Sequence, residues 1–591
     1  MGLNKWAAWL GFACAGFASG ELVAKADPNK VLHVVFEAAD DGFDLMRTNS
    51  LYSTWAARNI FENLYAYDYL ARPVKLRPVL AEALPEITEG GKVFTVRIKK
   101  GIYFTPDPAF KGQRRELVAQ DFIYTIKRVM DPANRSTQSG EFEDKIIGLD
   151  EQVELAKKTG KFDYNAPIAG LKALDRYTLQ YRLKRPDYTF IYYLADGASA
   201  PVAREVVEMY GSNSGRHPIG TGPYILKEYV PRSKIVFEAN PDYRPTVWDF
   251  ESSGDPWDKQ IVADMKGKSL PQIGRVEVSI MEEHQGRWLA FASGQSDFDL
   301  LPEIVVPKVI VGDKLNAELT KKGVKLYRFV EPGVTGTYFN FKDPVVGGYS
   351  KEKNALRRAI AMSFDIQSVI DQAFFGQALK AEMDVPPSVV GHDPKYRNGI
   401  PYNPELANKL LDRFGYRKGA DGFRTLPDGK PLIIKINSGT TVREKTKTEV
   451  WRKSLNKVGL RSEFSIAGFA DNLKAAYACQ LPMFGLGNIA SIPDGSDFAN
   501  IYYGPNALRG NFGCYQSKVF DEAFAKARTV PPGSPEHLQL YRTMTRQLEA
   551  DTARVVELWR YRNWVVQPWV KGFKKHPMLH ADWLYLDVDK H

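Results

Sequence analysis

Residues 219–245 read IGTGPYILKEYVPRSKIVFEANPDYRP. This stretch predicts a β-hairpin, because two short β-prone runs flank a turn in which Pro231 presets φ. Apolar side chains alternate with charged ones in the second run, although Val236 blurs the pattern, so we expect one buried face and one mostly solvated face. Gly220 and Gly222 predict a tight backbone approach that a side chain would obstruct.

The wording of this stretch, "GTGPY…L…Y…F..N.DY", resembles the signature of the family 5 extracellular solute-binding proteins. These are the peptide, dipeptide and nickel receptors of bacterial ABC importers. Four other stretches are similar to family segments in the same order: residues 76–104, 119–132, 354–376 and 566–572. The resemblance covers nearly the whole mature chain.

Composition is that of a soluble globular protein, with 44% hydrophobic and 25% charged residues. A length of 591 residues predicts two to four domains. The formal net charge of +10 is modest for this size and is scattered, without a run of five like charges. We therefore expect no binding of nucleic acid.

The N-terminus predicts a signal peptide, because Lys5 precedes a short apolar run and Ala24 and Ala26 fit the small-x-small cleavage rule. We place the signal at residues 1–26 and expect cleavage before Asp27, with cleavage after Gly20 as the alternative. The run falls short of the ~20 residues that span a bilayer. The mature chain is therefore expected to be exported to the periplasm.

Two cysteines remain after the signal, Cys479 and Cys514. An even pair in an oxidising compartment predicts a disulfide, and two unrelated buried thiols are the alternative. Closing a loop of about 36 residues would stabilise the fold by roughly 3–4 kcal/mol on the chain-entropy model.

Periodicity predicts helices over 51–65, 119–130 and, as one long helix, 354–376. Residues 93–98 alternate as a strand. Asn403 is expected to cap a further helix, with Pro404 at its first position.

No catalytic or metal-binding motif is present: the sequence has no HExxH, CxxC, P-loop or G-x-S-x-G. Asp40, Asp41 and Asp44 lie close together but lack further ligands nearby, so we expect no metal site. The chain is expected to need no cofactor and to be no enzyme.

The resemblance implies an α/β fold with two lobes and a ligand held between them, in the manner of cluster C binding proteins. It places lobe 1 at residues 27–65, 191–330 and 565–591, an extra domain of lobe 1 at 66–190, and lobe 2 at 331–564. The crossings between lobes are expected at about 331–338 and 558–564. Lobe closure is a hinge motion.

In peptide receptors of this family, an Asp in a "W.aDyPDp.nf" segment pairs with the peptide α-ammonium. The matching segment here is residues 487–498, in which Ser491 stands at the position of that Asp and Asn488 replaces the aromatic residue. A Ser hydroxyl supplies no charge, and a buried ammonium without a carboxylate partner is costly. Either the ligand lacks a free N-terminus or another carboxylate, such as Asp494 or Asp497, takes this role.

The remaining expected ligand-binding residues come from three places. Residues before and in the first helix align with family positions that contact ligand backbone, and aromatic residues at the crossings form pocket walls or core. The full expected set is Asn49, Leu51, Tyr52, Tyr338, Gly487, Asn488, Ile489, Ser491, Asp494 and Trp559.

The function that the resemblance implies is that of a periplasmic receptor of an ABC importer. It would capture an oligopeptide or related solute as a monomer and present it to permease subunits at the inner membrane. A receptor for a non-peptide solute is the first alternative, and a secreted hydrolase is the second.

Overall fold

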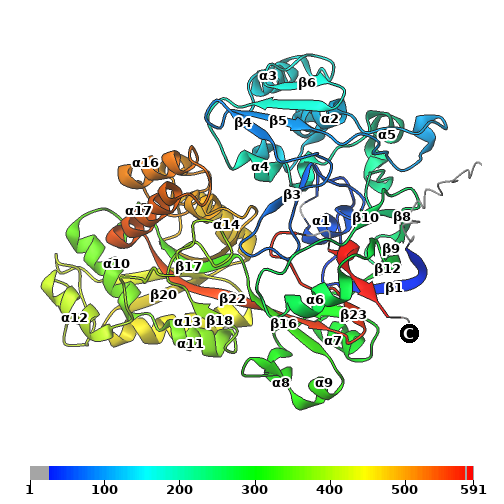
Figure 1. Ribbon diagram of the computed structural model, residues 1–591. Helices are drawn as coiled ribbons and strands as arrows, with labels where there is room; N and C mark the ends of the chain where they lie inside the picture. The colour runs from blue at the N-terminus through cyan, green and yellow to red at the C-terminus, as the bar shows by residue number, and fades with distance from the viewer. Residues whose placement is uncertain (1–25, 49, 580–581, 590–591) are drawn as a thin grey trace, which may run out of the picture.

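The computed structural model describes residues 26–48, 50–579 and 582–589. The molecule has three parts: one on the right of Figure 1, one on the left, and a smaller one above them. We call the right-hand part lobe 1, the left-hand part lobe 2 and the upper part the extra domain. The expected signal peptide lies almost wholly outside the described residues.

One long strand, β22 (Arg554–Val566), runs through both lobes (Figure 1). Its first half pairs with β17 (Gly333–Phe339) and β18 (Ala378–Lys380) of lobe 2. Its second half pairs with β13 (Phe298–Leu300) and β16 (Lys325–Val330) of lobe 1. A single sheet therefore continues from one lobe to the other, and the chain makes its other crossing in the short link between β16 and β17.

Lobe 1 is built around β1 (Asp27–Phe36), which pairs in parallel with β12 (Ile273–Ile280). The predicted hairpin follows at the sheet edge as β8 (Tyr224–Val230) and β9 (Lys234–Ala239). Val236 is buried like its neighbours Ile235 and Phe237. The solvated face that we expected on β9 is therefore wrong at its centre, since both faces are covered there.

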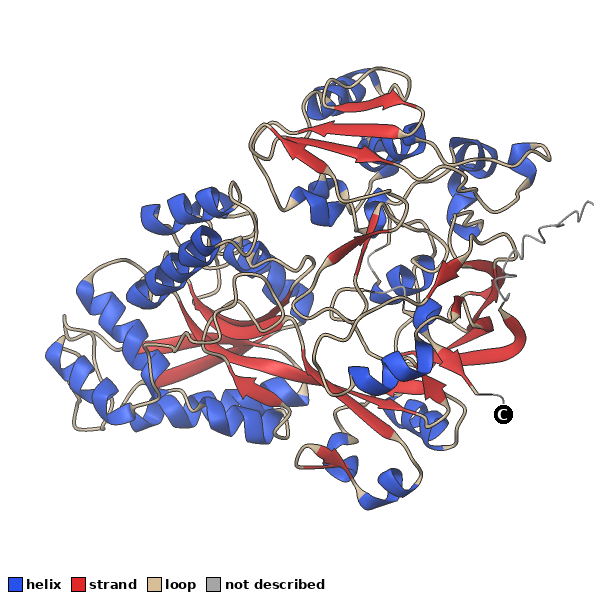
Figure 2. Ribbon diagram, viewed as in Figure 1, coloured by secondary structure: helices blue, strands red, loops and turns tan. Residues whose placement is uncertain are grey.

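Helices of lobe 1 are short and lie around this sheet (Figure 2). They are α1 (Leu51–Ala57), α5 (Arg204–Tyr210), α6 (Asp258–Met265), α7 (His284–Ala292), α8 (Val306–Val309) and α9 (Ala317–Lys321). The expected helix over 51–65 ends early, at Ala57. The carbonyls of Asn59 and Ile60 instead accept hydrogen bonds from Tyr224 and Gly222.

Gly220 and Gly222 make this close backbone approach possible. A Cβ on Gly220 would lie 2.1 Å from the Ile60 oxygen, and one on Gly222 would lie 2.4 Å from the same atom. The expected close backbone approach is confirmed, and it explains why the chain leaves the helix at this point.

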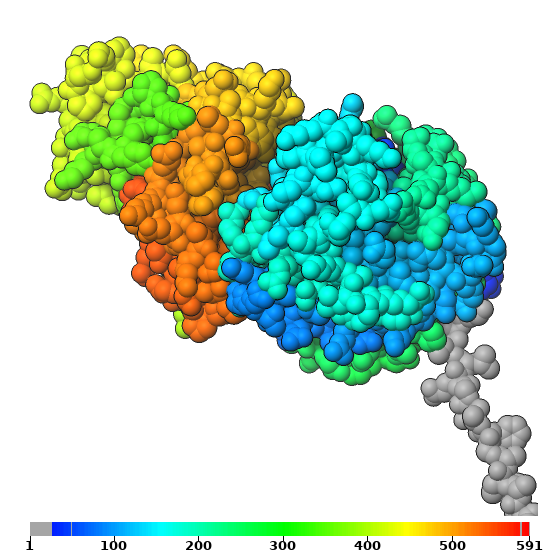
Figure 3. All heavy atoms as spheres, turned by 90° about the horizontal axis from the view of Figure 1, so that it is seen from above, coloured from blue at the N-terminus to red at the C-terminus, as the bar shows by residue number. Residues whose placement is uncertain are grey.

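The extra domain is a four-stranded sheet in the order β4-β5-β7-β6, accompanied by three helices. Its strands are β4 (Glu86–Thr88), β5 (Val93–Arg97), β6 (Leu171–Asp175) and β7 (Thr178–Arg182). Its helices are α2 (Ala119–Met130), α3 (Leu149–Thr159) and α4 (Phe190–Tyr193). Seen from above, it lies over lobe 1 and against the nearest part of lobe 2 (Figure 3).

Lobe 2 continues the sheet through β17, β21 (Met483–Ile489), β19 (Ile433–Ser438) and β20 (Arg461–Ile466). Four helices lie to the left of and below this sheet in Figure 1: α10 (Lys351–Ser363), α11 (Ile366–Ala373), α12 (Pro404–Arg413) and α13 (Val442–Lys457). Above it lie α14 (Phe469–Tyr477), α16 (Lys518–Ala527) and α17 (Pro535–Asp551). The expected cap of α12 is confirmed, because Asn403 accepts a hydrogen bond from the Leu406 amide.

The single long helix expected over 354–376 is wrong. The chain forms α10 and α11 instead, because Phe364 adopts an extended conformation and Asp365 caps a new helix at the Ser368 amide. Apolar residues near helical spacing continue through this break, so periodicity alone did not reveal it.

The expected disulfide between Cys479 and Cys514 is confirmed, with the two Cα atoms 6.0 Å apart. It joins the end of α14 to the loop before α16. The Asn340 side chain donates a hydrogen bond of 2.6 Å to the Cys479 carbonyl, which fixes the bridge to the end of β17.

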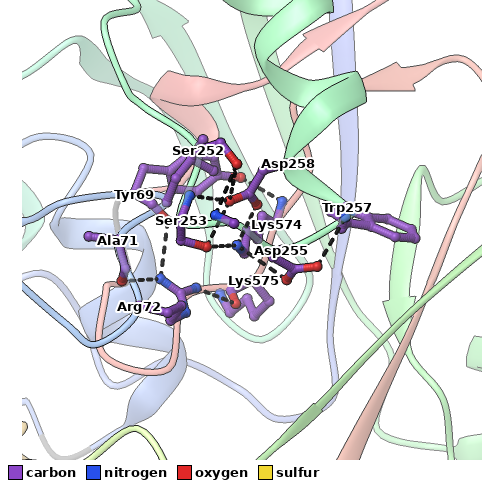
Figure 4. A network of polar contacts seen from close by, with 12 residues as sticks. Tyr69, Ala71, Arg72, Ser252, Ser253, Asp255, Trp257, Asp258, Lys574 and Lys575 are labelled. Atoms are coloured by element: carbon purple, nitrogen blue, oxygen red, sulfur yellow. Dashed lines mark hydrogen bonds and ion pairs between the residues drawn. The ribbon is translucent and has the colours of Figure 1, made fainter.

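A buried network joins three distant segments of lobe 1 (Figure 4). Lys574 forms an ion pair with Asp258, and both side chains are fully buried. Asp258 also accepts a 2.7 Å bond from the Ser253 amide. Tyr69 donates to the Gly572 carbonyl and accepts from the Lys574 amide, each at 2.7 Å. The C-terminal segment is thereby held in a fixed position.

We predict that Lys574→Met destabilises the protein by about 3–5 kcal/mol in urea unfolding, because it leaves the Asp258 carboxylate buried without a counter-ion. Lys571→Met is the matched control. Lys571 pairs with Asp589 at the exposed surface, so its loss should cost at most ~1 kcal/mol. Equal effects of the two variants would contradict the prediction.

Candidate functional site

A cavity of about 480 Å³ lies between the lobes. Lobe 1 contributes the end of β1, the helix α1, β13 and the loop that follows Lys574, and lobe 2 contributes the end of β21. The two crossings contribute Glu331, Pro332, Arg562 and Trp564. Because its wall comes from both lobes and both crossings, any motion between the lobes changes its shape.

Four of the expected ligand-binding residues line this cavity: Leu51, Tyr52, Ile489 and Ser491. Leu51 and Ile489 are about half exposed, and they come from lobe 1 and lobe 2 respectively. Asn49 lies outside the described residues.

The other five expected residues do not line the cavity. Tyr338 and Trp559 are buried, and their rings contact Phe512 and His392 respectively. Gly487 and Asn488 lie on β21, where they pair with β17. Asp494 is 1% exposed and accepts a 2.9 Å hydrogen bond from the Tyr541 hydroxyl, which places its carboxylate in the interior of lobe 2.

Ser491 lies directly in front of a partly buried carboxylate, that of Asp497. Its amide and its hydroxyl donate to one oxygen of Asp497, at 2.6 and 2.7 Å, and the Ile492 amide donates to the same oxygen at 3.1 Å. Burial nevertheless raises the pKa of Asp497. Asp497 is therefore occupied in shaping the loop, and the Ser491 oxygen keeps its lone pairs for another donor.

The carboxylate in this wall that lies on the extra-domain side is Asp196. It accepts a 2.7 Å hydrogen bond from Arg58 and its side chain is 32% exposed. Sequence reasoning missed this residue, because Asp196 also caps a 3₁₀ turn at the Ala198 amide and looks like an ordinary turn residue.

Glu141 of the extra domain lies behind Asp196. Burial, and then the charge of Asp196, raise the pKa of Glu141 well above its usual value. One carboxyl oxygen of Glu141 has no hydrogen-bond partner among the described residues. Two carboxyl groups thus lie close together, and Lys145 and Arg58 are the nearby cations.

Aromatic side chains form the floor of the cavity. The ammonium of Lys575 lies 3.7 Å from the ring centre of Trp55 and 5.3 Å from that of Trp564. It also pairs with Asp582 at 2.7 Å, and the Trp55 indole donates to the same carboxylate at 2.6 Å. This arrangement neutralises Lys575, and the two indoles form an apolar part of the cavity wall.

The fold and the cavity between its lobes define a two-lobed binding protein. Residues 75–509 match the family model described as bacterial extracellular solute-binding proteins, family 5, middle part. The chain belongs to the bacterial extracellular solute-binding proteins of family 5, as its sequence motifs implied.

Two curated relatives illustrate the range of the family. The di/tripeptide-binding protein 2 of Pseudomonas aeruginosa is 25% identical over 533 residues, covering 88% of this chain and 87% of the relative. The glutathione-binding protein GsiB of Salmonella choleraesuis is 23% identical over 425 residues, covering 71% and 67%.

Solved structures share the fold. HbpA2 from Haemophilus parasuis superposes with a TM-score of 0.73 at 18% identity, over 95% of this chain and all of that one. DppA from Helicobacter pylori, in complex with the peptide STSA, gives 0.68 at 19%, over 95% and 99%. The expected two-lobed α/β fold is confirmed.

Neither a metal site nor a membrane span is found in the part of the chain that the structure describes. No group of three or more His, Cys, Asp or Glu residues there could hold a metal ion. Within those same residues, no helix combines the length and the apolar character that crossing a bilayer requires.

We predict that Glu141→Gln stabilises the ligand-free protein increasingly as pH rises from 4 to 8. Because the folded pKa of Glu141 is raised, its contribution to the free energy of unfolding is fully present below the unfolded pKa of about 4.5, where the group is protonated in both states. This contribution is lost as pH rises through the folded pKa, because the unfolded chain then releases the proton first. Glutamine cannot ionise, so Tm should exceed that of the wild type by roughly 1 °C at pH 8 for each kcal/mol recovered in a chain of 591 residues.

The matched control is Glu143→Gln, since Glu143 is exposed and lies two residues away. Thermal melts at both pH values should show no difference between this variant and the wild type. A gain for Glu141→Gln that is the same at pH 4 and pH 8 would contradict the assignment of a buried neutral carboxyl.

Proposed function

We propose that the protein is the periplasmic receptor of an ABC importer, which closes its two lobes over a short peptide and delivers it to the membrane permease. The observation that carries this proposal is the cavity whose wall is shared by both lobes and both crossings. Membership of family 5 supports the role of solute receptor, and the di/tripeptide-binding relative supports the peptide class.

The proposal includes export and assembly. The N-terminal motif supports a signal peptide removed before Asp27, and the disulfide suits an oxidising compartment. We propose that the protein acts as a monomer. The moving units would be lobe 1 with its extra domain and lobe 2, divided in the link at Glu331 and on β22 between Arg560 and Tyr561, where the strands change partners.

The size of the cavity favours a small ligand. Its volume of about 480 Å³ falls within the range of ~300–1,000 Å³ that small-molecule sites occupy. A few residues of extended peptide would fill the cavity, and the apolar part of its wall that Trp55 and Trp564 form would accept an apolar side chain.

Asp196 takes the place of the missing family carboxylate in this proposal. It lines the same cavity as Ser491, it is partly exposed, and a second carboxyl group lies behind it. A peptide ammonium would pair with the Asp196 carboxylate, with the Ser491 oxygen as an additional acceptor.

We predict that Asp196→Asn weakens the binding of peptides with a free N-terminus by about 10- to 100-fold, since it removes the charge that meets the ammonium. Binding of the same peptides after N-acetylation should change by less than about threefold. Isothermal titration calorimetry with both forms measures this difference, and it also shows whether the variant still folds.

Asp313→Asn, at an exposed residue in a short turn of lobe 1, is the control and should leave both affinities unchanged. If Asp196→Asn weakens both peptide forms equally, the residue supports the wall and does not select the charge. Native mass spectrometry of the purified protein tests the alternative: a single co-purified non-peptide mass would replace the peptide class.

A further inference from the structure

The extra domain and lobe 2 contact each other away from the crossings. In Figure 1, α4 of the extra domain and α16 of lobe 2 both lie above β22. Seen from above, the part of lobe 2 drawn in orange lies against the extra domain, drawn in cyan (Figure 3). Apart from the crossings, the hydrogen bonds and ion pairs that join lobe 2 to the rest of the described chain lie at two places. One is the pair of Arg443 with Glu303 beside β22, and the other joins Arg528 to Asp187 and Tyr188.

Arg528 of lobe 2 makes two contacts with neighbouring residues of the extra domain. Its guanidinium donates a 2.5 Å hydrogen bond to the Asp187 carboxylate, and its carbonyl accepts a 3.2 Å bond from the Tyr188 amide. Arg528 is the C-cap of α16, at a helix end whose carbonyl groups lack partners within the helix. The backbone of the extra domain therefore supplies a donor to the end of a lobe 2 helix.

The loop that carries Asp187 is held in place by the extra domain itself. The Asp187 amide donates to the Gly91 carbonyl at 3.1 Å. One Asp187 oxygen accepts from the Thr189 amide at 3.1 Å and from the Thr189 hydroxyl at 2.6 Å. The Tyr188 ring lies against Gly91, where an added Cβ would come within 2.8 Å of it. One oxygen of Asp187 is thus used inside the loop, and the other pairs with lobe 2.

Asp187 is almost buried, whereas Arg528 is partly exposed. Their side chains are 5% and 40% exposed. A second cation, Lys145, lies near Asp187, but its ammonium donates to the Glu141 carbonyl at 2.6 Å and lies 3.9 Å from the ring centre of Tyr193. The guanidinium of Arg528 is therefore the charge that pairs with the Asp187 carboxylate directly.

The contact lies beside the ligand cavity without forming part of its wall. Neither Asp187 nor Arg528 lines the cavity, but the chain runs from Asp187 through α4 to Asp196, which does. Tyr193 of α4 lies near Asp497 of lobe 2, because burial and then the charge of Asp497 raise the pKa of Tyr193. Separation of the extra domain from lobe 2 would therefore open the cavity on its extra-domain side.

We propose that the contacts of Arg528 with Asp187 and Tyr188 form a clasp, which holds the extra domain and lobe 2 together in the closed protein and slows the release of a bound ligand. This inference rests on the proposed function, because it requires the lobes to move apart when a ligand leaves. It adds a determinant of release that does not contact the ligand. Opening of the lobes breaks both contacts of Arg528, whereas the paired crossing strands stay intact.

The two side chains contribute unequally to the clasp. In the open protein both charges are hydrated, and closure buries Asp187 against Arg528. Without the arginine, closure would bury a carboxylate that has lost its direct partner, which opposes closure. Without the charge of Asp187, closure loses an ion pair but buries no unpaired charge. Loss of the arginine should therefore be more harmful than loss of the carboxylate charge, and loss of both should be milder than loss of the arginine alone.

The competing explanation is that the pair only stabilises the local fold of the extra domain or of α16. In that case R528Q and D187N would lower Tm, their effects would add in the double variant, and the rate of ligand release would not change. A double-mutant cycle on the release rate separates the two explanations, because only the clasp predicts that D187N relieves the effect of R528Q.

The test is stopped-flow measurement of the release of trialanine on dilution, from wild type, R528Q, D187N and the double variant. Tryptophan fluorescence reports release, since Trp55 and Trp564 line the cavity. R528Q should raise the dissociation rate constant by about 10- to 30-fold and D187N by about three- to fivefold. The association rate constant should change by less than about threefold. The double variant should release the peptide more slowly than R528Q does.

R182Q and D144N are the matched controls within the extra domain. Arg182 pairs with Glu89 and Asp144 pairs with Arg185, and all four side chains are exposed. Neither variant should alter the release rate. Unchanged release from R528Q, or additive effects in the double variant, would overturn the proposal.

A measurement without ligand covers the case in which trialanine and other peptides do not bind, which would refute the proposed peptide function by itself. Leu155 of α3 and Val519 of α16 are about half exposed, so spin labels on L155C and V519C report the distance between the extra domain and lobe 2. Double electron–electron resonance should show a population at a short distance in the ligand-free wild type, and R528Q should lose most of it. The same distance distribution in both proteins overturns the clasp.

Discussion

The crossing strand β22 is hydrogen-bonded to strands of both lobes, with one register shift at Glu557, and this pairing fixes how the lobes are joined. Its thirteen residues pair with β17 and β18 at one end and with β13 and β16 at the other. A strand that is paired along its length cannot slide, so the two lobes share one backbone axis. Relative motion is thereby limited to bending and twisting near residues 558–562 and in the link at Glu331.

This constraint places charge at the hinge. Arg560 and Arg562 leave the crossing strand on one face and meet Glu331 of the other crossing. The two crossings are thus joined by ion pairs in addition to backbone bonds. Partly buried pairs of this kind are less screened by salt than surface pairs. The hinge region is therefore held by ion pairs, whereas the cores of the two lobes on either side of it are apolar.

Local features could be predicted from the sequence. The hairpin at 224–239 and the Asn403 cap depend on residues that are close together in the chain and have strong conformational preferences. The Cys479–Cys514 bridge could be predicted because only two cysteines remain after the expected signal peptide. The break between α10 and α11 could not be predicted, because the apolar spacing continues across it while Asp365 starts a new helix.

The candidate site was predictable only in part. Leu51, Tyr52, Ile489 and Ser491 were found through the family motif and do meet in the cavity. Asp196 and Glu141 come from separate segments, and each looks like an ordinary turn or surface residue in sequence. The fold brings them close together, which no short pattern encodes.

The network around Lys574 has a consequence for shortening of the chain. Residues 575–578 form part of the cavity wall, and they are fixed there by contacts to residues 69–72 and 252–258. The wall that begins with β1 is therefore completed by residues more than 500 positions further along the sequence. A chain truncated before Lys574 would lose both the buried ion pair and this part of the wall, so it would lack a finished site.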